Sequence, residues 1–122
     1  MAGGVAAIWG VDWDLQAPYP HPEQLRTHRA FWTRWPLGDG SSAAREDGSL
    51  VLLSADGDRA VVYAVDSDVV VLPPIPHGAS VWAVDTLLEY AELDVTPAGD
   101  GAGATWRAPY VSDWAVAVGP RP

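Results

Sequence analysis

The first residues that could do chemistry are Asp12 and Asp14, at the end of an apolar run that begins at Gly4. Two carboxylates that close a strand are a common way to hold a magnesium ion or to present an acid/base or nucleophilic aspartate. These aspartates are therefore candidate catalytic acids, with His28 as a proton shuttle. The alternative is that both carboxylates only terminate the strand and stay solvated.

Asp12-Trp13-Asp14 is similar to the D-x-D motif of the haloacid dehalogenases, and the similarity covers these residues alone. Leu15-Gln16-Ala17 follows here, in place of that family's glycine-threonine-type continuation. The chain also has no lysine, and its 122 residues leave no room for the family's cap. We therefore do not assign the chain to this family.

Basic and imidazole side chains follow the aspartates closely in the sequence. Arg26 and Arg29 are spaced one helical turn apart, where two guanidinium groups can clamp a carboxylate or a phosphate. His21 and His28 supply imidazoles in the same short stretch. Together these residues predict a ligand-binding cleft between the end of the first strand and the first helix. The alternative is that the arginines pair with acids of this protein.

Tryptophan is the strongest compositional anomaly, with seven in 122 residues. We expect Trp13, Trp106 and Tyr110 beside loops or at strand ends. An aromatic ring with one polar group is suited there to a ligand cleft or a protein interface. These three aromatics are therefore candidate ligand-binding residues as well. The alternative assigns them to the edge of the core.

Composition excludes several kinds of chemistry. The chain has no cysteine and no lysine, which excludes thiol nucleophiles, cysteine-ligated metals, Schiff bases and a phosphate-binding P-loop. It contains neither an H-E-x-x-H metal motif nor a G-x-S-x-G nucleophile elbow. The spaced acids, such as Asp56 and Asp58, lack the ligand series of a calcium loop and are typical of turns. We expect no metal and no cofactor.

The formal net charge of −9 also restricts the partners. A field of that sign repels the phosphate backbone of nucleic acids, so DNA and RNA are not expected to bind. The apolar stretches are far shorter than the roughly 20 residues of a membrane-spanning helix. The first residues carry no positive charge before their apolar run and do not resemble a signal peptide. We therefore expect a cytoplasmic protein.

The first part of a single domain, residues 1–122, is expected to hold one strand and one helix. The apolar run Gly4–Asp12 predicts a buried strand, and the prolines of Gln16–Pro22 predict a stiff loop. A helix is predicted over Pro22–Trp35, with a proline in its first turn and apolar residues on one face. Leu37–Asp47 is rich in small and polar residues and predicts a mobile loop.

The rest of the chain is expected to form a sheet and a second helix. Three strands are predicted as a meander, Ser49–Ser54, Arg59–Val65 and Val69–Leu72, with a tight hairpin at Asp56-Gly57. A second helix, Val81–Leu93, would place Asp85, Glu89 and Glu92 on its outer face. Two closing strands follow, Ala104–Ala108 and Trp114–Val118, with Pro109 between them.

This order, β-α-β-β-β-α-β-β, predicts an α+β fold with two helices on one face of a mainly antiparallel sheet. The predicted core residues are spread over all elements: Ile8, Leu25, Trp32, Leu52, Val62, Leu88 and Val116.

Three functions fit these expectations. The first is a non-catalytic, acidic interaction protein that binds and neutralises or regulates a protein partner, as immunity proteins and inhibitors do. The outer acids Asp85, Glu89 and Glu92 would then steer a basic partner. The second is a compact enzyme or small-ligand protein with the cleft described above. The third is a subunit of a larger assembly.

Overall fold

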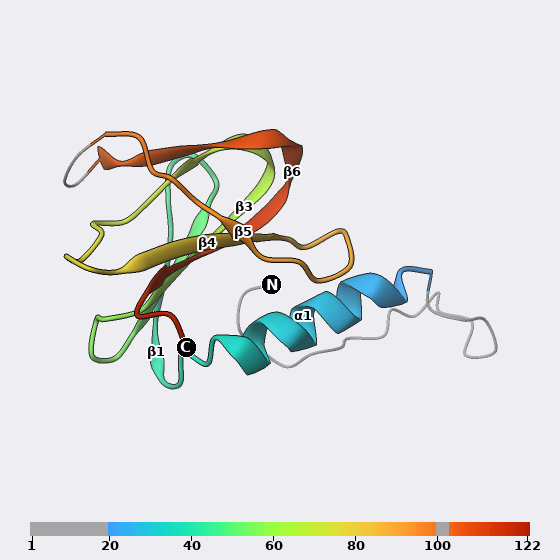
Figure 1. Ribbon diagram of the computed structural model, residues 1–122, viewed down its shortest axis with the longest axis horizontal. Helices are drawn as coiled ribbons and strands as arrows, with labels where there is room; N and C mark the ends of the chain where they lie inside the picture. The colour runs from blue at the N-terminus through green and yellow to red at the C-terminus, as the bar shows by residue number, and fades with distance from the viewer. Residues whose placement is uncertain (1–19, 100–102) are drawn as a thin grey trace.

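A computed structural model describes residues 20–99 and 103–122, which form one helix and one six-stranded antiparallel sheet (Figure 1). The strand order is β1-β2-β3-β6-β4-β5. The α+β class and the antiparallel sheet are therefore confirmed, with one helix in the described part instead of two. The predicted strand Gly4–Asp12 lies outside the described residues. The elements are α1 (Pro22–Arg34), β1 (Gly40–Ala44), β2 (Leu50–Ser54), β3 (Ala60–Val71), β4 (Ser80–Asp85), β5 (Leu93–Asp94) and β6 (Thr105–Gly119).

The first helix is confirmed with nearly the predicted bounds. Pro22 lies in its first turn, where a missing N–H removes no helical hydrogen bond, and Glu23 lies at the positive end of the helix dipole. The helix ends at Arg34, and the Trp35 N–H still donates to the Phe31 carbonyl at 2.8 Å. Phe31 and Trp35 are fully buried against the sheet. In the described residues, no helix is long and apolar enough to span a membrane.

The hairpin at Asp56-Gly57 is confirmed, and a second hairpin precedes it. β2 and β3 pair antiparallel across the turn, where Gly57 has a φ of +75°. The predicted loop Leu37–Asp47 contains β1, which pairs with β2 along five residues. Its Gly-Ser-Ser-Ala-Ala sequence has no apolar alternation, so the sequence pattern gave no sign of a strand.

β3 and β6 are long, irregular strands where shorter ones were predicted. Residues 66–68, which separate the predicted strands Arg59–Val65 and Val69–Leu72, are instead a break in the β3–β6 register within one strand, and Asp66 has a φ of +50°. Between the pairs Ser67↔Ser112 and Val69↔Arg107, β6 advances by five residues while β3 advances by two. Pro109 lies in this break, where it removes no ladder hydrogen bond. Both strands bend here (Figure 1).

The predicted second helix is wrong. Residues 80–85 form β4, the loop 86–92 follows, and Leu93–Asp94 pairs back as β5. Residues 81–85 are buried in succession because β4 is covered on both faces. A continuous apolar run of this length fits a buried helix and a buried strand equally, and here the β-branched and aromatic residues favour the strand.

The central strands of the sheet carry apolar residues on both faces, and both of these faces are buried. Trp82 and Val84 point toward α1, whereas Val81 and Ala83 point toward the other face. The cluster under α1 contains Phe31, Trp35, Val61, Trp82, Val84, Ala115 and Ala117. The cluster on the other face includes Val62, Val70, Leu72, Trp106, Trp114, Val116 and Val118.

The predicted core is only partly confirmed. Val62 and Val116 are fully buried. Leu25, Trp32 and Leu52 are half-buried. Leu88 is 53% exposed, because it lies in the loop after β4 and not on a helix. Ile8 lies outside the described residues.

Candidate functional site

The predicted cleft is only partly within the described residues. Asp12, Trp13 and Asp14 lie outside them. Of its basic members, His21 directly precedes α1 and His28 lies within it. His21 is exposed, with its Nδ1 3.2 Å from the Glu23 Oε1. His28 is half-buried with its ring edge-on to Trp32, and this burial lowers the pKa of His28, so the neutral imidazole is favoured.

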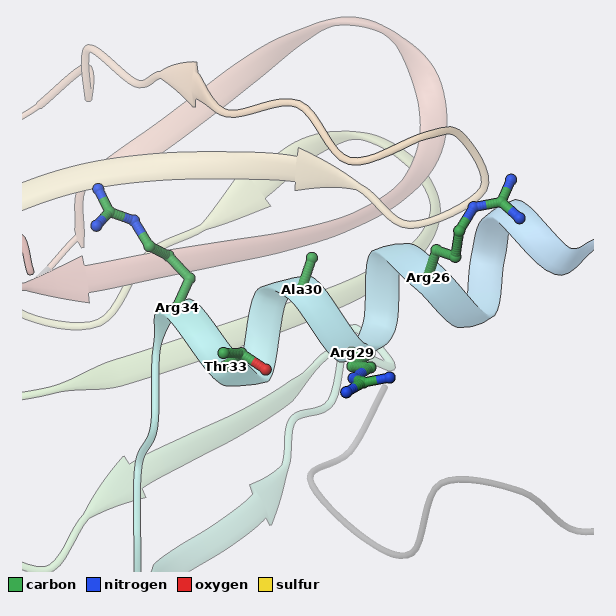
Figure 2. Close-up of a pocket in the computed structure, with 5 residues that line it drawn as sticks. All are labelled: Arg26, Arg29, Ala30, Thr33 and Arg34. Carbon is green, nitrogen blue, oxygen red and sulfur yellow. The ribbon is translucent and has the colours of Figure 1, made fainter.

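The arginines of α1 are largely paired within the protein. Arg26 donates to the Glu89 carboxylate, and Arg34 Nε donates to the Glu92 Oε1 at 3.1 Å. Among the described residues, Arg29 forms no ion pair. Arg26 and Arg29 point in different directions from the helix (Figure 2). The expectation that these arginines bridge to acids of the same chain is thus confirmed for Arg26.

A shallow depression of about 540 Å³ lies on the surface of α1. Its lining consists of Arg26, Arg29, Ala30, Thr33 and Arg34 (Figure 2). Two of the three guanidinium groups are neutralised by Glu89 and Glu92, so Arg29 carries the net positive charge there. Among the described residues, the depression therefore offers one arginine without an ion pair to an anionic ligand, and its lining contains no acid/base group.

Glu92 joins α1 to the C-terminal end of the chain. Its carboxylate accepts hydrogen bonds from Arg34, from Arg121 at 3.0 Å and from the Tyr90 hydroxyl at 2.6 Å. Burial alone would raise the pKa of Glu92, but these three donors outweigh it and lower that pKa. Burial and the Glu92 carboxylate together raise the pKa of Tyr90. Glu92 is therefore engaged within the protein.

The other acids predicted on the outer face of a helix also have partners. Asp85 is the last residue of β4 and is only 7% exposed. Its Oδ1 accepts from the Ser112 hydroxyl at 2.8 Å and from the Leu87 N–H at 2.9 Å. The prediction that Asp85 lies on the outer face of a helix is wrong, because this segment is a buried strand. Of the three, only Glu89 is exposed, and its carboxylate pairs with Arg26.

The predicted aromatic residues divide between core and surface. Trp106 is buried, with its ring edge-on to Trp114 at 5.1 Å between centroids. Tyr110 is 46% exposed and packs on the outer side of Trp114 at 5.2 Å. The indole of Trp114 donates to the Tyr110 carbonyl at 3.4 Å. Tyr110 is therefore an exposed ring on a rigid, buried aromatic support.

Several exposed apolar side chains lie on the three segments that meet at the bend of β3 and β6. We call this group the bend patch; its members are Val65, Leu87, Leu88, Tyr110 and Val111. Val65 and Val111 are 57% and 56% exposed. In Figure 1 the bend of β6 and the loop after β4 lie at the same end of the molecule.

Asp113 holds the parts of the bend patch together. Its carboxylate accepts from the Asp66 N–H at 2.8 Å, next to Val65. Its carbonyl accepts from the Thr86 N–H at 2.9 Å and from the Thr86 hydroxyl at 3.0 Å, next to Leu87. The segments of β3, β6 and the loop after β4 therefore meet at one residue.

Of this surface, the sequence predicted Tyr110 alone as a binding residue. It predicted Val65 at the end of a strand, and Leu87 and Leu88 on the inner face of the second helix. Asp66 and Pro109 are the residues that could have indicated the patch. Both interrupt the regular pairing of strands, and each lies beside apolar residues.

Within residues 20–99 and 103–122, no three histidine, aspartate or glutamate side chains lie close enough together to hold a metal ion. Comparison of the chain with protein-family models, with curated proteins and with solved structures found no match.

Proposed function

We propose that this chain is a non-catalytic interaction protein that binds a basic protein partner through the bend patch. The observation that carries the proposal is the exposure of five apolar side chains on three segments that meet at one residue, Asp113. A contiguous apolar surface is typical of protein interaction sites, and a half-exposed tyrosine is a common anchor in them. Tyr110 lies on the buried Trp114, so little conformational freedom is lost on binding.

Charge supports a basic partner. The whole chain carries −9, and no arginine pairs with Asp66 or Asp113 among the described residues at the bend. Acids around an apolar patch favour approach of a positively charged surface and speed its association. That Asp85, Glu89 and Glu92 bind the partner stays a prediction; Glu89 is the exposed one of the three and directly follows Leu88 in the chain.

The test is capture of proteins from an extract of the source cells by the immobilised chain. The patch variant is Val65→Ser with Val111→Ser, and the control is Val71→Ser with Leu93→Ser, two apolar residues of 38% exposure outside the patch. We expect a basic protein to be retained by the wild type and the control, released by salt, and lost with the patch variant. Retention of the same proteins by the patch variant would contradict the proposal.

The depression on α1 supports a second candidate, a protein that binds a small anion. Arg29, which forms no ion pair within the described residues, supplies a charge there, and the predicted ligand-binding residue Arg26 and the predicted proton shuttle His28 lie on the same helix. Calorimetric titration with inorganic phosphate and with a dicarboxylate tests this function. Binding that Arg29→Gln abolishes and Arg107→Gln leaves intact would support it, and absence of heat with both anions would exclude it.

A further inference from the structure

The outer edge of β1 is an unprotected sheet edge within the described part of the chain. β1 is first in the strand order and pairs with β2 alone. All five residues are exposed, and the sequence Gly-Ser-Ser-Ala-Ala contains neither a proline nor a charge. Edge strands usually carry such a feature, because an edge without it offers its free peptide groups to another strand.

Two backbone hydrogen bonds fix which peptide groups of β1 face outward. The Ala55 N–H donates to the Asp39 carbonyl at 3.0 Å, and the Arg45 N–H donates to the Ser49 carbonyl at 2.8 Å. Residues 39 and 45 therefore direct peptide groups toward β2. The β1–β2 register is regular between them, so residues 41 and 43 do the same. The N–H and carbonyl groups of residues 40, 42 and 44 face away from the sheet.

The charges that flank β1 are complementary to those of a second β1. Asp39 precedes the strand and Arg45 follows it. In an antiparallel pair centred on Ser42, Asp39 of each copy lies opposite Arg45 of the other. These are positions without mutual hydrogen bonds, where opposed side chains lie closest.

The same register satisfies the outward peptide groups. Ser42 of one copy lies opposite Ser42 of the other, and Gly40 lies opposite Ala44. All these residues face outward, so each N–H meets a carbonyl of the other strand. The Arg45 Nη1 donates to the Val71 carbonyl of the same chain, and the guanidinium has further N–H groups that can donate to a carboxylate.

We infer that two copies of this chain associate by antiparallel pairing of β1 about a two-fold axis at Ser42. The two six-stranded sheets then form one continuous sheet, with ion pairs between Asp39 and Arg45 at both ends of the contact. The inference is independent of the bend patch, which lies at another part of the fold. Since the contact is one strand of small residues, the dimer dissociates on dilution.

The first test is sedimentation velocity of the full chain over a range of concentrations. The wild type shifts from monomer to dimer as concentration rises. Ser42→Pro removes an N–H that faces away from β2, so the β1–β2 ladder keeps all its bonds while the two central bonds of the dimer are lost. The dissociation constant rises about tenfold or more. Ser42→Thr keeps the N–H and is the matched control, with an unchanged dissociation constant.

The second test exchanges the flanking charges. Asp39→Arg and Arg45→Asp each place like charges opposite one another and weaken the dimer about threefold. The double exchange restores opposite charges and returns the dissociation constant to the wild-type value.

A wild type that stays monomeric at every concentration overturns the inference, as does an unchanged dissociation constant in Ser42→Pro. Failure of the double exchange to restore association overturns the assigned register. If Ser42→Pro lowers the melting temperature of a monomer without changing its mass, the edge is covered by a segment of the same chain, and the inference is wrong.

Discussion

Two regions of this protein use the same kinds of apolar side chain in opposite ways. Under α1, Phe31, Trp35 and Trp82 are fully buried, and the Trp82 ring contacts the other two, with ring centroids 5.5–5.6 Å apart. At the bend patch, Val65 and Val111 are more than half exposed. Burial of an aromatic side chain contributes to the free energy of folding, whereas an exposed apolar side chain contributes little until a partner covers it. The comparison separates what stabilises this fold from what is available for binding.

The largest expected effect is loss of the buried aromatic contact. Trp82→Ala should lower the free energy of unfolding by about 3–5 kcal/mol, because it opens a cavity under α1. Chemical denaturation monitored by circular dichroism measures this change. Trp82→Phe should cost less, because the indole N–H of Trp82 has no hydrogen-bond acceptor among the described residues. Equal losses for the two variants would show that packing volume is not the main contribution.

A smaller loss is expected from Gly119→Ala, which tests how closely the end of β6 approaches α1. Gly119 has a φ of +146°, and an added Cβ would lie 2.7 Å from the Asp58 carbonyl oxygen and 3.1 Å from the Trp35 ring. Overpacking of this kind should cost about 1–3 kcal/mol of unfolding free energy. Gly48→Ala is the control for the positive φ alone, because its Cβ would meet no atom within 4 Å. A loss no larger than that of the control would contradict the close approach.

The next effect concerns pH. The pKa of Glu92 is lower in the folded protein than in the unfolded chain, where it is about 4.3. The ionised carboxylate therefore stabilises the folded protein fully above that pH, and this stabilisation is lost as the pH falls through the pKa of the folded protein. Glu92→Gln should cost about 1 kcal/mol at pH 7 and should reduce the loss of stability on acidification. Thermal melts between neutral pH and pH 3 measure both. Glu46→Gln, at an exposed residue, is the control and should change neither the stability at pH 7 nor the loss of stability on acidification.

The smallest stability effect is expected at the bend patch. Val65→Ser with Val111→Ser should change the free energy of unfolding by less than about 1 kcal/mol, because both side chains are already mostly in water. Urea denaturation of the double variant beside Trp82→Ala makes the comparison. A loss of several kcal/mol would mean that these valines support the bend itself, and the contrast between the two regions would fail.

The elements that depend on local sequence signals were predicted better than the bend of β3 and β6. The helix starting at Pro22 and the hairpin at Asp56-Gly57 follow from proline and glycine chemistry, and both are confirmed. Residues 81–85 could not be assigned by periodicity, because a strand covered on both faces loses its alternation. The consequence was a false helix that placed Asp85 at the surface and Leu88 in the core.

The candidate site was less predictable because it depends on long-range contacts. The ion pairs of Arg26 with Glu89 and of Arg34 with Glu92 join residues about sixty positions apart, which no local pattern encodes. The sequence led us to expect that arginines of α1 pair with acids of the same protein, and Arg26 does. The acids, however, lie on a loop and not on a helix. The bend patch arises where Asp113 joins three segments, and this also required the structure.

The most direct test of the central claim is a binding titration with the basic partner that the capture experiment identifies. Val65→Ser with Val111→Ser should raise the dissociation constant about tenfold or more, since two apolar contacts of a desolvated interface are lost. Val71→Ser with Leu93→Ser should leave that constant unchanged. If both double variants bind as the wild type does, or if both lose the same affinity, the bend patch is not the binding surface.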